Sequence, residues 1–193
     1  IEEVNDVVAR EFPLTIFINE REVVTLVCSP QSLRELAVGF LISEGLIAKY
    51  VDVTSMEIQE KEGLFNIKLA SDPFSLDSFL RRNIASCCGK GRAGLYFIND
   101  ARQVKNIVFT SKLFSGEHLI ELMKEMENKS EGFRLTGGLH NSALGGDNIL
   151  FMSEDIGRHN AVDKVIGSLI ISEQAVDDKI LLLSGRDRKS TRL

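Results

Sequence analysis

The chain has 193 residues, of which 44% are hydrophobic and 26% are charged, a composition typical of a globular protein with a sizeable core. Its formal net charge of -5 at pH 7 argues against an extended nucleic-acid groove, so we expect no nucleic-acid partner. No apolar run approaches the ~18 residues that a membrane span needs, and no secretory signal segment opens the chain. We therefore expect a cytoplasmic protein without a membrane partner. Because it begins with Ile1, we also expect the numbering to start inside a longer gene product.

The first part of the chain predicts two hairpins with one helix between them. The β-rich runs 14–18 and 23–28 form the first hairpin, and residues 55–69 form the second. Ser29 is the expected N-cap of the helix, with Pro30 at its first position and Glu44 near its end. The apolar side chains of this helix recur on one face, at Leu33, Leu36, Ala37, Phe40 and Leu41.

The cysteines do not form a disulfide framework, because three thiols cannot all pair within one chain and Cys87 and Cys88 are adjacent. Cys28, at the end of a β-rich run, is predicted to be a small buried hydrophobe. Cys87 and Cys88 lie in a glycine-rich, electropositive loop at residues 83–94, a setting that exposes a thiol and lowers its pKa. The loop favours a reactive thiol, with two buried structural thiols as the alternative.

The second half of the chain predicts helices that alternate with strands. Ser115 is the expected N-cap of an amphipathic helix, and the apolar runs 133–136, 148–152 and 180–183 are expected strands. Each run is followed by small and polar residues. In an open α/β sheet, ligands bind in the crevice outside the carboxyl ends of the strands. The sequence therefore predicts a binding crevice at one edge of a sheet.

The polar stretch after the second of these runs leads into a helix, for which Asn160 is the expected N-cap. The free backbone N–H groups of the first helical turn, with Arg158 and His159 beside them, suit a phosphate or another anion. The alternative is structural: Glu154 and Asp155 form a solvated ion pair with Arg158, and His159 is a packed residue of the connection.

The change from hairpins to strand–helix alternation places a domain boundary near residues 95–115. We expect an α/β protein, α+β overall. Its first domain is a small hairpin-and-helix unit over residues 1–100, which ends in the cysteine loop. Its second domain is an α/β unit over residues 101–193.

Four motifs carry a resemblance to a known family. They are Ser29-Pro30 with Gly39-Phe40-Leu41 and Ser43-Glu44-Gly45; Thr136-Gly137-Gly138 with His140; Glu154-Asp155-Ile156-Gly157-Arg158-His159-Asn160-Ala161 with Asp163-Lys164; and Ser184-Gly185-Arg186. With these motifs, from about residue 13 to residue 186, the chain resembles the formate dehydrogenase accessory sulfurtransferase family, FdhD.

The resemblance implies that the second half adopts a cytidine-deaminase-like three-layer α/β fold. Deaminase chemistry and a metal are not expected, because the sequence lacks His-x-Glu followed by Pro-Cys-x-x-Cys. By resemblance, the protein is a sulfurtransferase that takes persulfide sulfur from a cysteine desulfurase. It passes the sulfur to the molybdenum cofactor, bis-molybdopterin guanine dinucleotide, so that formate dehydrogenase becomes active. The resemblance also implies a homodimer.

The resemblance also assigns residues to the site. Cys88 takes the place of the family's first motif cysteine and is the expected sulfur carrier, and Lys90 and Arg92 are expected to lower its pKa. A guanine nucleotide should mimic part of the cofactor. The residues expected to bind the cofactor are Gly137, Gly138, His140, Asp155, Gly157, Arg158, His159, Ser184, Gly185 and Arg186.

Two features depart from the family pattern. The family usually shows Cys-Gly-x-Cys-Gly, whereas this chain has Gly91 at the second cysteine position and Cys87 as an extra neighbour. One thiolate is enough to carry one sulfur. Residues 187–193 match nothing in the family, so we expect that the chain is truncated or that these residues are not natural sequence.

Two other functions fit the same motifs. A cofactor chaperone would hold the molybdenum cofactor and dock on formate dehydrogenase without chemistry, which the missing second cysteine favours. A metal hydrolase on a deaminase-like fold would use His140, Asp155 and His159 as ligands, but it lacks paired cysteines at zinc spacing.

Overall fold

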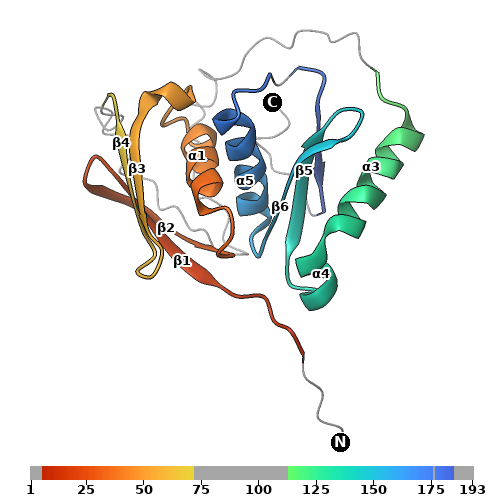
Figure 1. The fold of residues 1–193 in the computed structure, drawn as a ribbon, viewed down its shortest axis with the longest axis horizontal. Helices are drawn as coiled ribbons and strands as arrows, with labels where there is room; N and C mark the ends of the chain where they lie inside the picture. Colours follow the sequence, from red (N-terminus) through yellow and green to blue (C-terminus); the bar gives the residue numbers. More distant parts are fainter. Residues whose placement is uncertain (1–5, 72–112, 176, 185–193) are drawn as a thin grey trace, which may run out of the picture.

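The computed structural model describes residues 6–71, 113–175 and 177–184 (Figure 1). Its helices and strands form two sheets with helices packed between and beside them. The mixed α/β fold class that we expect from the sequence is confirmed. The predicted domain boundary and the cysteine loop lie outside the described residues.

The N-terminal sheet contains both predicted hairpins. Its strands are β1 (Phe12–Ile18), β2 (Arg21–Cys28), β3 (Val53–Gln59) and β4 (Leu64–Leu69), in the order β2-β1-β4-β3. The two hairpins are antiparallel, and they join where β1 runs parallel to β4. The alternation of buried and exposed residues along β1 and β4 directs one face of the sheet toward a hydrophobic core.

Helix α1 (Leu33–Ser43) covers that face of the sheet, and all five residues of its predicted apolar face are buried. It ends as expected, at Glu44 with Gly45 in the left-handed region. Its predicted start at Ser29 and Pro30 is wrong. The helix is preceded by Ser32, which has a φ of 53° and makes no side-chain cap. Ser29 makes contacts elsewhere, which are described with the site below.

The C-terminal sheet has three strands, β5 (His140–Gly145), β6 (Ile149–Asp155) and β7 (Ile180–Leu183), in the order β6-β5-β7. Helix α3 (Gly116–Lys129) lies on one face and α5 (Arg158–Ile171) on the other, which is the three-layer arrangement expected for this half (Figure 1). Ser115 caps α3 as predicted, because its Oγ accepts the His118 N–H at 3.1 Å. A likeness to cytidine deaminases stays a prediction.

The prediction of a strand at residues 133–136 is wrong. These residues belong to the short helix α4 (Glu131–Thr136), and Gly137 ends it with a φ of 63°. A run of four apolar and polar residues cannot be assigned by periodicity alone. The strand of this region is β5, which begins four residues later, and it is antiparallel to both β6 and β7.

Helices α1 and α5 lie side by side and join the two halves of the molecule (Figure 1). A Cβ atom added at Gly39 of α1 would lie 1.7 Å from the Asp163 carbonyl oxygen. One added at Gly167 of α5 would lie 1.9 Å from the Glu35 carbonyl oxygen. Because the nearest atoms are backbone, the two helices approach more closely than any side chain at these positions would permit.

We expect Gly39→Ala to lower the free energy of unfolding by about 1–3 kcal/mol, because the added methyl group forces the two helices apart. Urea unfolding followed by circular dichroism measures the change. Gly116→Ala is the matched control, since a Cβ atom there meets nothing within 4 Å. Equal stability of the two variants would show that close approach of α1 and α5 is not required.

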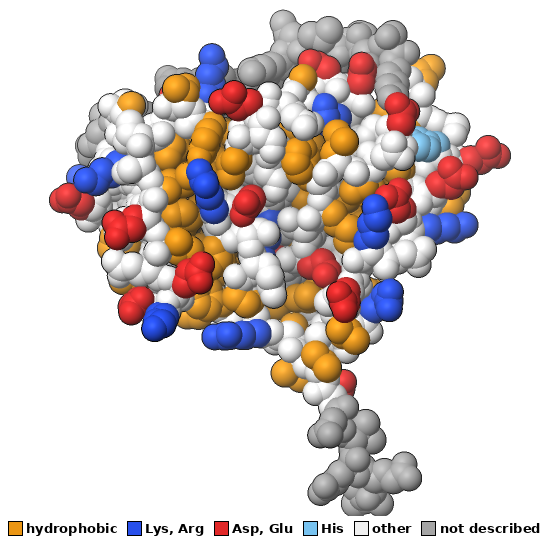
Figure 2. All heavy atoms as spheres, in the orientation of Figure 1, with side chains coloured by type: hydrophobic (Ala, Val, Ile, Leu, Met, Phe, Trp, Pro, Cys, Tyr) orange, Lys and Arg blue, Asp and Glu red, His pale blue; other side chains and the backbone are white. Residues whose placement is uncertain are grey.

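On the face shown in Figure 2, acidic and basic side chains are interspersed.

Within the described residues, no helix is long and apolar enough to cross a membrane.

Candidate functional site

The segments that we expect to form the crevice meet at one edge of the C-terminal sheet. His140, at the start of β5, pairs with Asp155 at the end of β6. On the other side of β5, the Ser184 N–H donates to the Asn141 carbonyl oxygen at 3.0 Å, and the Asn141 N–H donates to Ser184 Oγ at 2.7 Å. The start of one strand therefore meets the ends of two antiparallel neighbours. We call the described residues of this meeting point, 137–141, 154–159 and 184, the sheet edge.

The centre of the sheet edge is a buried ion pair. Lys164 Nζ lies 2.7 Å from Asp155 Oδ2, and both side chains are fully buried. Lys164 comes from the second turn of α5, and Asp155 is the last residue of β6. Removing both charges from water costs free energy. The ion pair stabilises the fold only if neighbouring groups make the hydrogen bonds that water would otherwise make.

Ser29 and Asn160 supply those hydrogen bonds. The backbone N–H and the hydroxyl of Ser29 both donate to Asp155 Oδ2, at 2.9 and 3.0 Å. Lys164 Nζ donates to Ser29 Oγ at 2.9 Å and to the Ser29 carbonyl oxygen at 3.2 Å. Asn160 Nδ2 donates to Asp155 Oδ1 at 2.9 Å and to the Val27 carbonyl oxygen at 2.8 Å. We call Ser29, Asp155, Asn160 and Lys164 the buried network.

The buried network ties the N-terminal half of the molecule to the sheet edge, because Ser29 follows β2 while the other three residues belong to β6 and α5. Ser43 of α1 adds a further link, a 2.7 Å hydrogen bond from its hydroxyl to Asp163 Oδ1. Both oxygens of Asp155 are thus occupied. Its side chain is fully buried and helps to hold the sheet edge in place, and its predicted role in cofactor binding stays a prediction.

The structural alternative from the sequence, a solvated ion pair of Glu154 and Asp155 with Arg158, is wrong. Asp155 pairs with Lys164 in the interior. Glu154 accepts the N–H groups of Gly132 and Phe133, at 3.0 and 2.9 Å, and so holds the N-terminus of α4. The connection that follows α4, Gly137 and Gly138, is exposed at the sheet edge.

Helix α5 starts earlier than predicted. Its first residue is Arg158 and its N-cap is Gly157, whose N–H donates to Asp155 Oδ1 at 2.8 Å. Asn160 lies within the helix and is buried, so its predicted role as the N-cap is wrong. Arg158 and His159 are half-buried in the first turn. Within the described part of the chain, the Arg158 guanidinium makes no hydrogen bond or ion pair.

The described residues hold no cluster of three histidine, cysteine or acidic side chains that could bind a metal. The hydrolase alternative needs the carboxylate of Asp155 as a ligand, and the buried network occupies both of its oxygens. The Asp155 carboxylate is already paired with the Lys164 ammonium group, so it is a poor ligand for a metal cation.

Comparison with known proteins now decides the family. Residues 9–188 match the FdhD/NarQ family. The chain belongs to this family. The sulfur carrier protein FdhD of Halalkalibacterium halodurans is 43% identical over 184 residues, which cover 94% of this chain and 68% of the relative. The protein of the same name from Bacillus subtilis strain 168 is 42% identical over 189 residues, which cover 96% of this chain and 71% of the relative.

A solved structure has the same fold. The crystal structure of a proposed formate dehydrogenase accessory protein from Desulfotalea psychrophila superposes with a TM-score of 0.71. The match covers 95% of this chain and 68% of that one, at 21% sequence identity. The FdhD resemblance that the sequence motifs indicate is therefore confirmed, and so is the fold.

Of the three cysteines in this family member, the structure describes Cys28. Its side chain is fully buried, and its Sγ donates to the Phe12 carbonyl oxygen at 3.4 Å. Burial, and to a smaller extent the negative charge of Asp155, raise the pKa of the Cys28 thiol to about 12, against a smaller lowering by the positive charge of Lys164. The thiol is therefore protonated at neutral pH, and the prediction of a small buried hydrophobe is confirmed.

The other residues of the expected sulfur-carrier loop and part of the expected cofactor site lie outside the described residues. They are Cys87, Cys88, Lys90, Arg92, Gly185 and Arg186.

Sequence reasoning missed the roles of Ser29, Asn160 and Lys164 in this family fold. A serine after a strand looks like a helix cap, and a lysine in a helix usually lies in water. One local signal was available: Lys164 lies two positions after Val162 and directly before Val165, in a helix that is apolar on several sides. The structure adds Asn141 and Ser142, both buried, whose Oδ1 and Oγ atoms have no hydrogen-bond partner among the described residues.

Proposed function

We propose that this protein is a sulfur carrier that serves formate dehydrogenase, and that it moves persulfide sulfur from a cysteine desulfurase to bis-molybdopterin guanine dinucleotide. The observation that carries the proposal is its 43% identity, over 94% of the chain, to a relative named as a sulfur carrier protein. The cofactor is written here as the substrate that receives the sulfur. In this proposal the protein acts as a sulfurtransferase.

The proposed chemistry needs one nucleophilic thiolate. The Cys88 thiolate attacks the outer sulfur of the desulfurase persulfide, the sulfur–sulfur bond breaks, and the desulfurase cysteine leaves as a thiolate. Cys88 then holds the persulfide, and no external oxidant or reductant is required. Cys28 is a poor candidate for this step, because its buried thiol stays protonated at neutral pH. Two candidates remain, Cys87 and Cys88, and the family motif favours Cys88.

The sheet edge offers groups that suit the other end of the reaction. Arg158, whose guanidinium has no partner among the described residues, is a cation at the start of a long helix, where negative charge is stabilised. Gly137 and Gly138 expose backbone nearby, and Ser184 is also exposed. Phosphate groups and a guanine base of the cofactor are chemically compatible with these donors. The buried network supports the proposal indirectly, since it fixes the helix that carries Arg158 and His159.

The test of the proposal is sulfur loading. The full chain is incubated with a cysteine desulfurase and cysteine, and its intact mass is measured before and after reduction. A carrier gains the mass of one sulfur atom, which the reductant removes. A cofactor chaperone is the second candidate, favoured by Gly91 at the second cysteine position. A chain that never gains sulfur but still binds guanine nucleotide would support the chaperone instead.

Arg158→Ala should weaken guanine-nucleotide binding by about 1.5–3 kcal/mol, the scale of one charge-assisted hydrogen bond. Isothermal titration calorimetry with GDP measures the change. Arg34→Ala is the matched control, because Arg34 is an exposed arginine near the start of the other long central helix, α1. Equal GDP affinity in wild type and Arg158→Ala would remove Arg158 from the binding site.

A further inference from the structure

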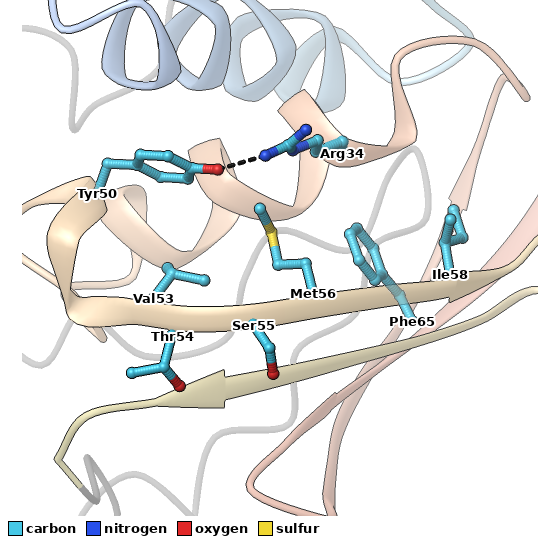
Figure 3. Close-up of a pocket in the computed structure, with 8 residues that line it drawn as sticks. All are labelled: Arg34, Tyr50, Val53, Thr54, Ser55, Met56, Ile58 and Phe65. Carbon is cyan, nitrogen blue, oxygen red and sulfur yellow. Dashed lines mark hydrogen bonds between the residues drawn. The ribbon is translucent and has the colours of Figure 1, made fainter.

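A groove lies on the opposite side of the molecule's central helix pair from the sheet edge, between α1 and strand β3. It has a volume of about 350 Å³. Figure 2 shows hydrophobic side chains exposed along this boundary, with a basic side chain among them. The described residues that line the groove are Arg34, Tyr50, Val53, Thr54, Ser55, Met56, Ile58 and Phe65 (Figure 3).

The floor of the groove is apolar and is built mainly by one strand. Met56 and Val53 point from β3 toward α1, and Phe65 of the neighbouring strand β4 lies beside them (Figure 3). Val53, Met56 and Ile58 are only half-buried, although they pack against the main core. Helix α1 therefore leaves part of their apolar surface uncovered, and that surface can still be removed from water.

Strand β3 is also one of the two outermost strands of its sheet, within the described residues. It pairs with β4 on one side, and no other strand of the described part of the chain pairs with the alternate backbone N–H and C=O groups on its other side. An edge of this kind can accept another extended segment through backbone hydrogen bonds. The free edge and the apolar groove belong to the same strand.

The rim of the groove is cationic. Arg34 Nη2 donates to the Tyr50 hydroxyl at 2.5 Å, which holds the guanidinium over the floor (Figure 3). Arg34 lies in the first turn of α1, where the helix dipole adds positive potential. None of the described lining residues is acidic. Among the described residues, Tyr50 is the hydrogen-bond partner of the Arg34 side chain, and the other N–H donors of Arg34 can meet a carboxylate.

We propose that this groove binds an extended segment of a partner protein that adds to the edge of β3. The segment carries an apolar residue and, two positions later, an aspartate or glutamate. Side chains in a strand alternate between faces, so residues two positions apart point the same way. The apolar side chain covers Met56 and Val53, and the carboxylate meets Arg34. This interaction surface does not depend on the proposed sulfur transfer.

The experiment is a selection of random peptides on the immobilised full chain, run in parallel on Arg34→Glu. Wild type should enrich peptides with an apolar residue followed two positions later by an acidic one. Arg34→Glu should enrich lysine or arginine at that second position, because the charge at the rim is reversed. A consensus peptide from the wild-type selection should bind Arg34→Glu at least about tenfold more weakly in fluorescence anisotropy.

Lys124→Glu, a charge reversal on the exposed face of α3, is the control and should select the same peptides as wild type. Absence of an enriched motif, or the same motif from wild type and Arg34→Glu, would overturn the proposal. A second copy of this chain is the other possible occupant. If Met56→Lys converts a dimer to a monomer in analytical ultracentrifugation, a second copy covers the groove and the peptide proposal fails.

Discussion

Lys164→Met is expected to lower the free energy of unfolding by about 3–5 kcal/mol, because it leaves the Asp155 carboxylate buried without a counter-charge. Both side chains are fully buried and 2.7 Å apart. Methionine has a similar length, so the loss of packing is small and the electrostatic loss dominates. Ser29 also loses the ammonium group that its hydroxyl and carbonyl oxygen now accept from. Urea unfolding followed by circular dichroism measures the effect.

Two further variants isolate the ion pair. Lys124→Met removes an exposed lysine from α3 and should change the stability by no more than about 0.5 kcal/mol. Asp155→Asn with Lys164→Met removes both charges, so the double variant should lose less stability than the sum of the two single variants. If Lys164→Met is as stable as Lys124→Met, the buried network does not hold the two halves together.

Cys88→Ser is expected to abolish sulfur loading by a cysteine desulfurase, because a hydroxyl cannot accept and hold the persulfide sulfur. Cys28→Ser should load as well as wild type does, since the Cys28 thiol is fully buried and its pKa is raised to about 12. Cys87→Ser should at most lower the rate, through its position next to the carrier. Intact-mass measurement over a time course of loading gives the rate for each variant.

The control for this series addresses folding. Serine at position 28 places a hydroxyl in the core, which costs stability if it finds no partner. Cys28→Ala avoids that cost, so it should load normally even if Cys28→Ser is partly unfolded. Loading of Cys88→Ser at the wild-type rate would show that Cys88 is not the carrier, and would move the cofactor chaperone ahead of the sulfurtransferase.

The sequence by itself determined the elements whose signals are local. Two hairpins follow from β-rich runs around polar turns, and both are present. Helix α3 follows from an apolar face and from Ser115, whose side chain caps the next turn of its own chain. The end of α1 follows from Glu44 and Gly45. In each case the residues that decide the structure lie within a few positions of each other.

The sequence also predicted correctly which segments meet at the sheet edge, although one of the three strands used in that prediction is wrong. Three apolar runs with polar ends predicted one crevice outside the carboxyl ends of three strands. The segments do meet, but the first run is the helix α4 and the strand after it runs in the opposite direction. The polar residues between the elements indicated where the sheet edge lies in the chain. The direction of β5 could be decided only by its pairing with β6 and β7.

Only the tertiary structure decided where α1, α4 and α5 begin, because groups in or just before their first turns bond to groups that are distant in the chain. Glu154 accepts two N–H groups of α4, and Ser29 meets Asp155 across 126 positions of sequence. Asn160 turns inward to Val27 and Asp155, so Gly157 becomes the cap of α5. A side chain that looks like a helix cap instead donates a hydrogen bond to a buried carboxylate, since an unsatisfied charge in the core costs more than a lost cap.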